Sequence, residues 1–108
     1  MPFIETTSPV QYSETVKASK VFLTYFFSDG CPPCKDLSPR IASLMDELAD
    51  IPWTKIDPSV FPEVAAQNLV FTVPIAAVYA YGREVFKSSR FVDIAQLRKT
   101  LEAYRDAE

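Results

Sequence analysis

One stretch of the sequence decides the fold: Phe27-Ser28-Asp29-Gly30-Cys31-Pro32-Pro33-Cys34-Lys35. It holds both cysteines of the chain, spaced as Cys-x-x-Cys. An apolar run ends where the stretch begins, and apolar residues at helical spacing follow it. We therefore interpret the stretch as a redox dithiol at a strand-to-helix junction.

The elements on either side of this stretch form a strand–helix–strand unit. Residues 21–27 are β-branched and aromatic with almost no polar alternation, which predicts a strand buried on both faces. The stripe after Cys34 predicts a helix over residues 32–49, and Pro39 inside it predicts a kink. Residues 53–57 form the next strand, so the two strands are expected to be parallel with a right-handed crossover. The apolar positions of the helical stripe are Leu37, Ile41, Leu44, Met45 and Leu48.

The remaining elements are predicted from caps and turns. A helix over residues 9–18 begins after Ser8, with Val10 and Val16 as core contacts, and a strand at residues 3–5 is weakly signalled. A short helix is expected at residues 61–67. Two strands, residues 75–80 and 84–88, flank a glycine turn at 81–83 and form a hairpin. Asp93 caps the last helix, whose expected buried face is Ile94, Leu97, Leu101 and Tyr104.

Composition narrows the class of protein. With 108 residues, 48% of them apolar, the chain is expected to form one domain over residues 1–108. The net charge of −3 without a basic cluster argues against nucleic acid. The apolar runs are too short for a membrane span, and no secretory signal is visible, so a cytoplasmic location is expected. The absence of histidine argues against most metal sites, so neither metal nor cofactor is expected beyond the Cys31–Cys34 pair.

The dithiol chemistry follows from its place at the start of a helix. A thiol attacks a disulfide as the thiolate, and the helix N-terminus favours that anion. We expect Cys31, just before the helix, to be the exposed nucleophile. Cys34, one turn in, is expected to be the resolving thiol that closes the ring.

Four neighbours are expected to modulate this chemistry. Pro32 and Pro33 have no N–H group, so only amides from Cys34 onward can stabilise the thiolate, and both prolines stiffen the loop. Asp29 is expected to oppose thiolate formation, and Lys35 to favour it. Two other interpretations of the pair are a structural cysteine pair and a zinc site shared between two chains.

At this point the chain resembles the thioredoxin superfamily, with a Cys-Pro-Pro-Cys site. The resemblance covers residues 21–101, and its matches are Cys31-Pro32-Pro33-Cys34-Lys35, Pro39, residues 46–50, Ile56-Asp57, residues 63–68 and Val73-Pro74. It implies a thioredoxin fold: an α/β domain with a central mixed sheet of four or five strands and about four helices. It also implies a cis bond before Pro74 and a Val73 backbone that pairs with an extended substrate segment.

The chain departs from the family pattern around the dithiol. Gly30 and Pro32 stand where the family has Trp and Gly, and Ile75 stands where it has Thr. The family's buried Asp, a proton acceptor for the resolving thiol, is Tyr25 here, and the Lys that pairs with it corresponds to Trp53. A tyrosine is a poor base at neutral pH, since its usual pKa is about 10. These departures indicate a specialised protein with weak activity and a narrow partner.

The leading hypothesis is a monomeric, cytoplasmic thiol–disulfide oxidoreductase that exchanges with protein disulfides and takes electrons from a reductase. No membrane partner is expected. One alternative is a non-catalytic interaction module with the same fold, and another is a dithiol oxidase or isomerase. Phe27, Phe61 and Phe71 have two interpretations: core residues, which is the more common role of such aromatics, or an apolar docking surface around Cys31, for which Phe71 is the best candidate. The expected substrate-binding residues are Val73, Pro74, Gly30, Pro32 and Phe71.

Overall fold

A mixed β-sheet forms the centre of the computed structural model, which describes residues 3–89 and 91–107. Its strands are β1 (Val21–Phe26), β2 (Trp53–Ile56), β3 (Ile75–Ala80) and β4 (Arg83–Ser89), in the order β2-β1-β3-β4. β1 pairs in parallel with β2 and antiparallel with β3, and β3 pairs antiparallel with β4. β1, which leads into the dithiol stretch, is therefore an interior strand, and its predicted parallel pairing with β2 is confirmed.

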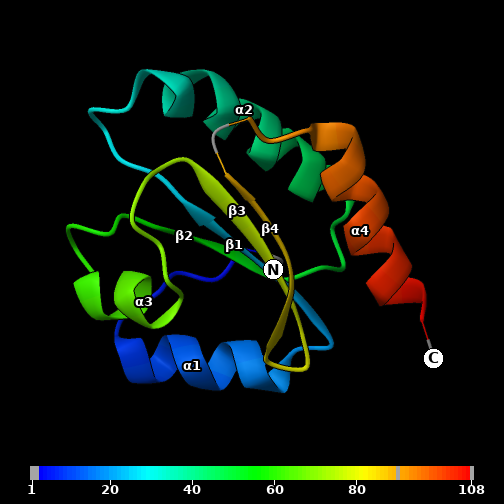
Figure 1. The fold of residues 1–108 in the computed structure, drawn as a ribbon. Coiled ribbons are helices and arrows are strands. Elements are labelled where there is room, and N and C mark those ends of the chain that lie inside the picture. Colours follow the sequence, from blue (N-terminus) through cyan, green and yellow to red (C-terminus); the bar gives the residue numbers. More distant parts are fainter. Residues whose placement is uncertain (1–2, 90, 108) are drawn as a thin grey trace.

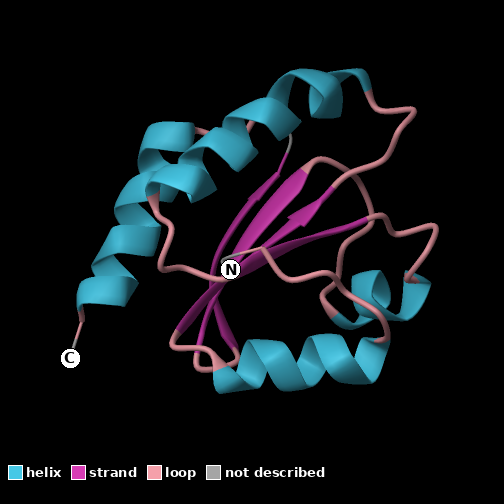
Figure 2. Cartoon of the chain, turned by 180° about the vertical axis from the view of Figure 1, so that it is seen from behind, coloured by secondary structure: helices cyan, strands magenta, loops and turns pink. Residues whose placement is uncertain are grey.

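Helices cover both faces of this sheet. They are α1 (Pro9–Ala18), α2 (Pro32–Glu47), α3 (Pro62–Gln67) and α4 (Ile94–Asp106). α2 and α4 lie on one face, and α1 and α3 lie on the other (Figure 1; Figure 2 shows the same layers from behind). Within the described residues this gives four strands and four helices, which confirms the predicted α/β architecture. None of these described helices is both long and apolar enough to cross a bilayer.

Each face of β1 belongs to a separate core. Leu23 and Tyr25 join the core under α2 and α4, whereas Phe22 and Phe26 join the core under α1 and α3. All of β1 is buried, as the apolar run predicted. Because β1 is buried on both faces, moving it would disturb two packed cores. The strand therefore fixes the position of the dithiol stretch that follows it.

Two predicted core contacts are wrong. Val10 is 68% exposed, because the buried positions of α1 are Tyr12 and Val16. Tyr104 lies near the end of α4 and is also exposed, whereas Leu97 and Leu101 are buried. An exposed apolar side chain is common on soluble proteins, so the helical stripe alone does not fix how far the buried face extends.

Element boundaries differ from the predictions by one or two residues at most. α2 ends at Glu47, β1 at Phe26 and β2 at Ile56, whereas β4 begins at Arg83. The weak strand near residue 3 is a single bridge between Phe3 and Trp53. Both predicted caps form: Ser8 Oγ accepts from the amide of Gln11 at 3.0 Å, and Asp93 Oδ1 accepts from the amide of Gln96 at 3.2 Å.

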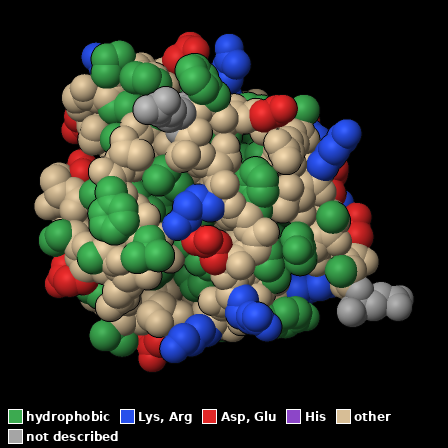
Figure 3. Space-filling view, viewed as in Figure 1, with side chains coloured by type: hydrophobic (Ala, Val, Ile, Leu, Met, Phe, Trp, Pro, Cys, Tyr) green, Lys and Arg blue, Asp and Glu red, His purple; other side chains and the backbone are tan. Residues whose placement is uncertain are grey.

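The surface carries charges of both signs. On the face seen in Figure 3, Lys and Arg side chains are interspersed with Asp and Glu. Ion pairs among the described residues include Arg98 with Glu47 at 2.7 Å and Lys87 with Glu84 at 3.1 Å. Exposed pairs of this kind contribute little to stability, about 0–1 kcal/mol each.

The hairpin between β3 and β4 turns on two residues with positive φ, Tyr81 at 51° and Gly82 at 84°. A two-residue turn of this type favours Asn or Asp followed by Gly. A Cβ at Gly82 would lie 3.1 Å from Lys17 Cγ, so glycine is required there by both backbone and space. Tyr81 is the strained member, because a bulky residue rarely adopts this conformation.

We expect Tyr81→Asn to stabilise the protein by about 0.5–1 kcal/mol, because asparagine tolerates positive φ better than tyrosine. The tyrosine side chain is largely exposed, so little packing is lost. Urea unfolding would show a higher midpoint for Tyr81→Asn and a lower one for the control Gly82→Ala. A lower midpoint for Tyr81→Asn would contradict this account of the turn.

Candidate active site

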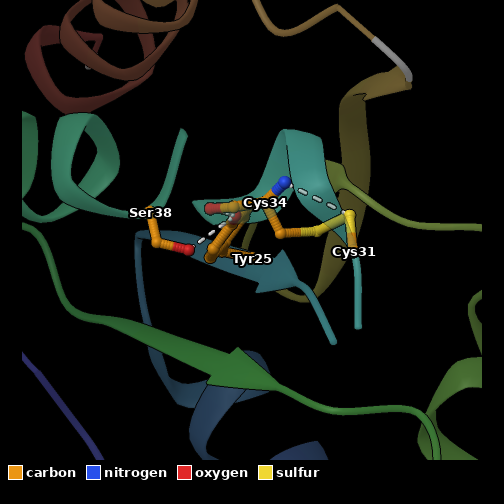
Figure 4. Close-up of a disulfide and its surroundings, with 4 residues drawn as sticks. All are labelled: Tyr25, Cys31, Cys34 and Ser38. Atoms are coloured by element: carbon orange, nitrogen blue, oxygen red, sulfur yellow. Dashed lines mark hydrogen bonds between the residues drawn. A yellow bond between two sulfur atoms is a disulfide. The ribbon is translucent and has the colours of Figure 1, made fainter. Parts of the chain in front are cut away.

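The two cysteines meet at the N-terminus of α2. Cys31 and Cys34 form a disulfide, with their Cα atoms 5.2 Å apart. Cys31 is the N-cap of α2, and its Sγ accepts a hydrogen bond from the amide of Cys34 at 3.2 Å (Figure 4). Pro32 and Pro33 occupy the first helical positions, so the Cys34 amide is the first in the helix that can donate. An amide aimed at this sulfur would stabilise a thiolate in the reduced protein.

The expected exposure of Cys31 is wrong for this oxidised state. The residue is 8% exposed, because its sulfur is turned toward the start of α2 and bonded to Cys34. The exposed residues of the motif are Gly30, Pro32 and Pro33. A substrate would therefore contact these neighbours before it contacts the sulfur.

The flanking residues are all at the surface. Asp29 and Lys35 are exposed. Gly30 is also exposed, and a Cβ added there would meet no atom within 4 Å. The local packing thus does not require glycine at this position, and a larger side chain would extend into solvent beside the dithiol.

Val73 and Pro74 lie beside the dithiol helix. The peptide bond between them is cis, Pro74 is buried, and Val73 is half-buried. Together with Pro33 and Leu37 they line a surface pocket of about 570 Å³. The structure therefore brings the predicted backbone-pairing residues to the rim of the dithiol stretch, although they lie some forty residues away in the sequence.

Of the two interpretations of the aromatic residues Phe27, Phe61 and Phe71, the structure supports core packing for the first two and exposure for Phe71. Phe71 is 83% exposed and lines a second pocket that also includes Val73. Phe27 and Phe61 are half-buried and pack against the two opposite cores. Of the three, Phe71 is therefore the residue available to a partner.

Sequence reasoning missed several residues of the first pocket. Phe91 is 89% exposed on its rim, and Val92 lies next to it. Asp36 and Arg40, on successive turns of α2, also line it, and their charged groups are 3.9 Å apart. Because Asp36 and Arg40 are four residues apart, the sequence predicts that they lie on one side of the helix. The sequence does not predict that they line the same pocket as Phe91.

Tyr25 reaches the dithiol helix from β1. Its hydroxyl lies 2.9 Å from Ser38 Oγ and donates to the carbonyl of Cys34 at 3.4 Å (Figure 4). Burial raises the pKa of the Tyr25 phenol above its ordinary value, so the group is neutral at neutral pH. Ser38 was not among the predicted site residues, although it lies one turn after Cys34 on the same helix face.

The neighbour of Tyr25 in the sheet is a lysine. The register pairs Tyr25 with Lys55, and it pairs Leu23 with Trp53, the residue expected beside Tyr25. Lys55 is exposed, and its Nζ lies 5.6 Å from the ring centroid of Phe27, which stacks on Tyr25 at 6.0 Å. The Phe27 ring thus contacts both the lysine and the tyrosine ring.

The chain belongs to the thioredoxin family. The family model described as Thioredoxin matches residues 3–103. Together with the disulfide at the Cys-x-x-Cys pair, this membership supports thiol–disulfide oxidoreductase activity.

Individual relatives agree with this assignment. The chain is 30% identical to the thioredoxin-like protein YdfQ of Bacillus subtilis over 94 residues, covering 87% of this chain and 84% of that protein. It is 28% identical to the thioredoxin of Chlamydia trachomatis over 102 residues, 94% of this chain and 99% of that protein. The structure of a mutant thioredoxin from Halobacterium salinarum superposes with a TM-score of 0.86 at 24% identity, covering 98% of this chain and 93% of that one. The fold is therefore the thioredoxin fold.

Proposed function

We propose that the chain reduces disulfides of protein substrates with Cys31 as nucleophile and Cys34 as resolving thiol. The Cys31 thiolate attacks one substrate sulfur, forms a mixed disulfide, and releases the other substrate sulfur as a thiolate. Cys34, after losing its proton, attacks Cys31 Sγ and releases the second substrate thiolate. The substrate gains two electrons and the protein keeps the intramolecular disulfide.

One observation carries this proposal: the sulfur of the N-cap residue of α2 is bonded to the sulfur of Cys34, one turn into the same helix. The Cys34 amide donates to Cys31 Sγ at 3.2 Å, and the Cα atoms are 5.2 Å apart. The disulfide thus joins the N-cap residue of α2 to the residue one turn into the helix, which is the closed ring that the proposed exchange leaves behind. A helix N-terminus also favours the thiolate of the residue that caps it, which is the form that attacks.

The substrate is proposed to bind as an extended segment along Val73. Val73 lines both pockets beside the dithiol, and Phe71 and Phe91 stand exposed at the two rims. Pairing with the Val73 backbone would place neighbouring side chains over these pockets. Gly30 and Pro32 complete the exposed rim around Cys31.

The cellular location, the oligomeric state and the electron donor are part of the same proposal. A pair of cysteines spaced for exchange, with no further cysteine in the chain, suits a reducing compartment, so we place the protein in the cytoplasm. We propose that it acts as a monomer on protein disulfides and that a reductase returns electrons to Cys31–Cys34.

Insulin reduction tests this function directly. With dithiothreitol as electron donor, the chain is expected to accelerate insulin precipitation above the rate of dithiothreitol alone. A rate equal to dithiothreitol alone would favour the interaction module.

The direction of exchange needs a second measurement. Equilibration of Cys31–Cys34 with glutathione buffers is expected to give a reducing potential. A strongly oxidising potential would instead support a dithiol oxidase or isomerase.

A further inference from the structure

The turn of α2 that carries Cys34 is held by fewer helix hydrogen bonds than usual. Pro32 and Pro33 stand at the first helical positions, where an N–H group has no partner inside the helix, but Pro39 lies in the helix interior and also has no N–H group. Because Pro39 cannot donate, the helix lacks the bond that would run to the carbonyl of Lys35. The first turn is therefore joined to the rest of α2 less firmly than in an uninterrupted helix.

The hydroxyl of Tyr25 bridges this weak point from the sheet. It donates to the carbonyl of Cys34 at 3.4 Å and lies 2.9 Å from Ser38 Oγ, the residue just before Pro39 (Figure 4). The contact to Ser38 is the shorter and stronger of the two. One phenol oxygen thus contacts α2 at both ends of the turn that begins with the resolving cysteine.

The position of this oxygen is set by β1 and not by the helix. Tyr25 is 1% exposed, belongs to the core under α2 and α4, and stacks on Phe27. Its backbone pairs with Lys55 on one side and Ala76 on the other. The ring therefore has little freedom, and its hydroxyl is a fixed point against which the start of α2 can be held.

We propose that Tyr25 is a positioning residue for the resolving thiol, since its hydroxyl holds the first turn of α2 against β1 through Cys34 and Ser38. This inference rests on the proposed function of the dithiol. While Cys31 is bonded to a substrate, no disulfide joins it to Cys34, so only the backbone keeps the two sulfurs in reach. The rate of an intramolecular step depends strongly on such positioning.

The chemistry of the group suits this role. A tyrosine phenol is protonated at neutral pH, and burial raises the pKa of Tyr25 further, so the group acts as a hydrogen-bond donor to the helix and not as the base that deprotonates Cys34. The Cys34 proton therefore leaves to water or to the departing substrate thiolate. Tyr25 therefore positions the start of α2 and transfers no proton.

Stopped-flow reaction of the reduced protein with the aromatic disulfide dithiobis(nitrobenzoate) tests the proposal. Attack by Cys31 releases the first coloured thiolate in a second-order phase, and attack by Cys34 on the mixed disulfide releases the second in a first-order phase. For Tyr25→Phe the second phase is expected to slow by about 3- to 10-fold, the factor that one ordinary hydrogen bond represents. The first phase is expected to stay within about 2-fold, because Cys31 and its Cys34 amide are untouched.

Two further variants separate positioning from general loss of stability. Tyr12→Phe is the matched control, because it removes a buried hydroxyl, 2.8 Å from Thr24 Oγ1, on the opposite face of the sheet. It is expected to leave both phases unchanged. Ser38→Ala removes the stronger contact alone and is expected to slow the second phase, but less than Tyr25→Phe does.

The outcomes distinguish this inference from the proposed function. An unchanged second phase in Tyr25→Phe, or equal slowing in Tyr12→Phe, would overturn the positioning role and leave the oxidoreductase proposal intact. A wild-type protein that never releases the second thiolate would overturn the resolving role of Cys34, and the inference with it.

Discussion

Cys34→Ser is expected to stop turnover and to accumulate mixed disulfides on Cys31. The variant keeps the nucleophile at the N-cap of α2 but lacks the thiol that displaces the bound substrate. Displacement of the substrate from Cys31 then depends on a thiol from solution, which is not held beside the mixed disulfide as Cys34 is. Insulin reduction should therefore fall by about 100-fold or more. Non-reducing electrophoresis and mass spectrometry should show the protein joined to its substrates.

The matched control is Cys31→Ser. It removes the attacking sulfur itself, so the expected rate is that of dithiothreitol alone and no adduct should form. Adducts on Cys31→Ser would instead assign the attack to Cys34. Full turnover by Cys31→Ser would end the proposed mechanism.

Leu44→Ala is expected to cause the largest loss of stability among the variants considered. Leu44 is a buried residue of α2 in the core that also includes Leu23 and Leu97. Removing its side chain leaves a cavity between the helix and the sheet, at a cost of about 2–5 kcal/mol. That is a large fraction of the stability of a domain this size, which is typically about 5–15 kcal/mol. Urea unfolding with far-UV circular dichroism measures the change.

The same substitution at an exposed position gives the control. Leu69 is mostly exposed, and Leu69→Ala is expected to change the free energy of unfolding by less than about 0.5 kcal/mol. Equal losses for the two variants would contradict the burial of Leu44. A large loss for Leu69→Ala alone would mean that its side chain packs in solution.

Much of the fold could be predicted because its signals are local. The apolar run of β1 could be accommodated only where both faces are covered, and the stripe after Cys34 has the period of a helix. Ser8 and Asp93 begin their helices because a short oxygen-bearing side chain satisfies free amides within its own turn. These features need no information from distant residues.

Exposure was harder to predict. Val10 and Tyr104 lie on helices at positions expected to be buried, but Val10 is 68% and Tyr104 37% exposed. Cys31 was expected to be open to solvent, and its sulfur is turned inward against the start of α2. Burial depends on where neighbouring elements pack, which a periodic pattern constrains only in part.

The sequence by itself determined the dithiol: the spacing of Cys31 and Cys34, the prolines between them, and a strand-to-helix junction that places both at a helix N-terminus. Only the tertiary structure decided what surrounds it, namely the Tyr25 hydroxyl on Ser38 and Cys34, and Phe91 on the pocket beside Val73. The reason is physical. Helix starts and cysteine spacing are set by bonds between near neighbours, whereas these contacts join residues that meet only after the sheet strands β1, β3 and β4 and the helix α2 have packed together.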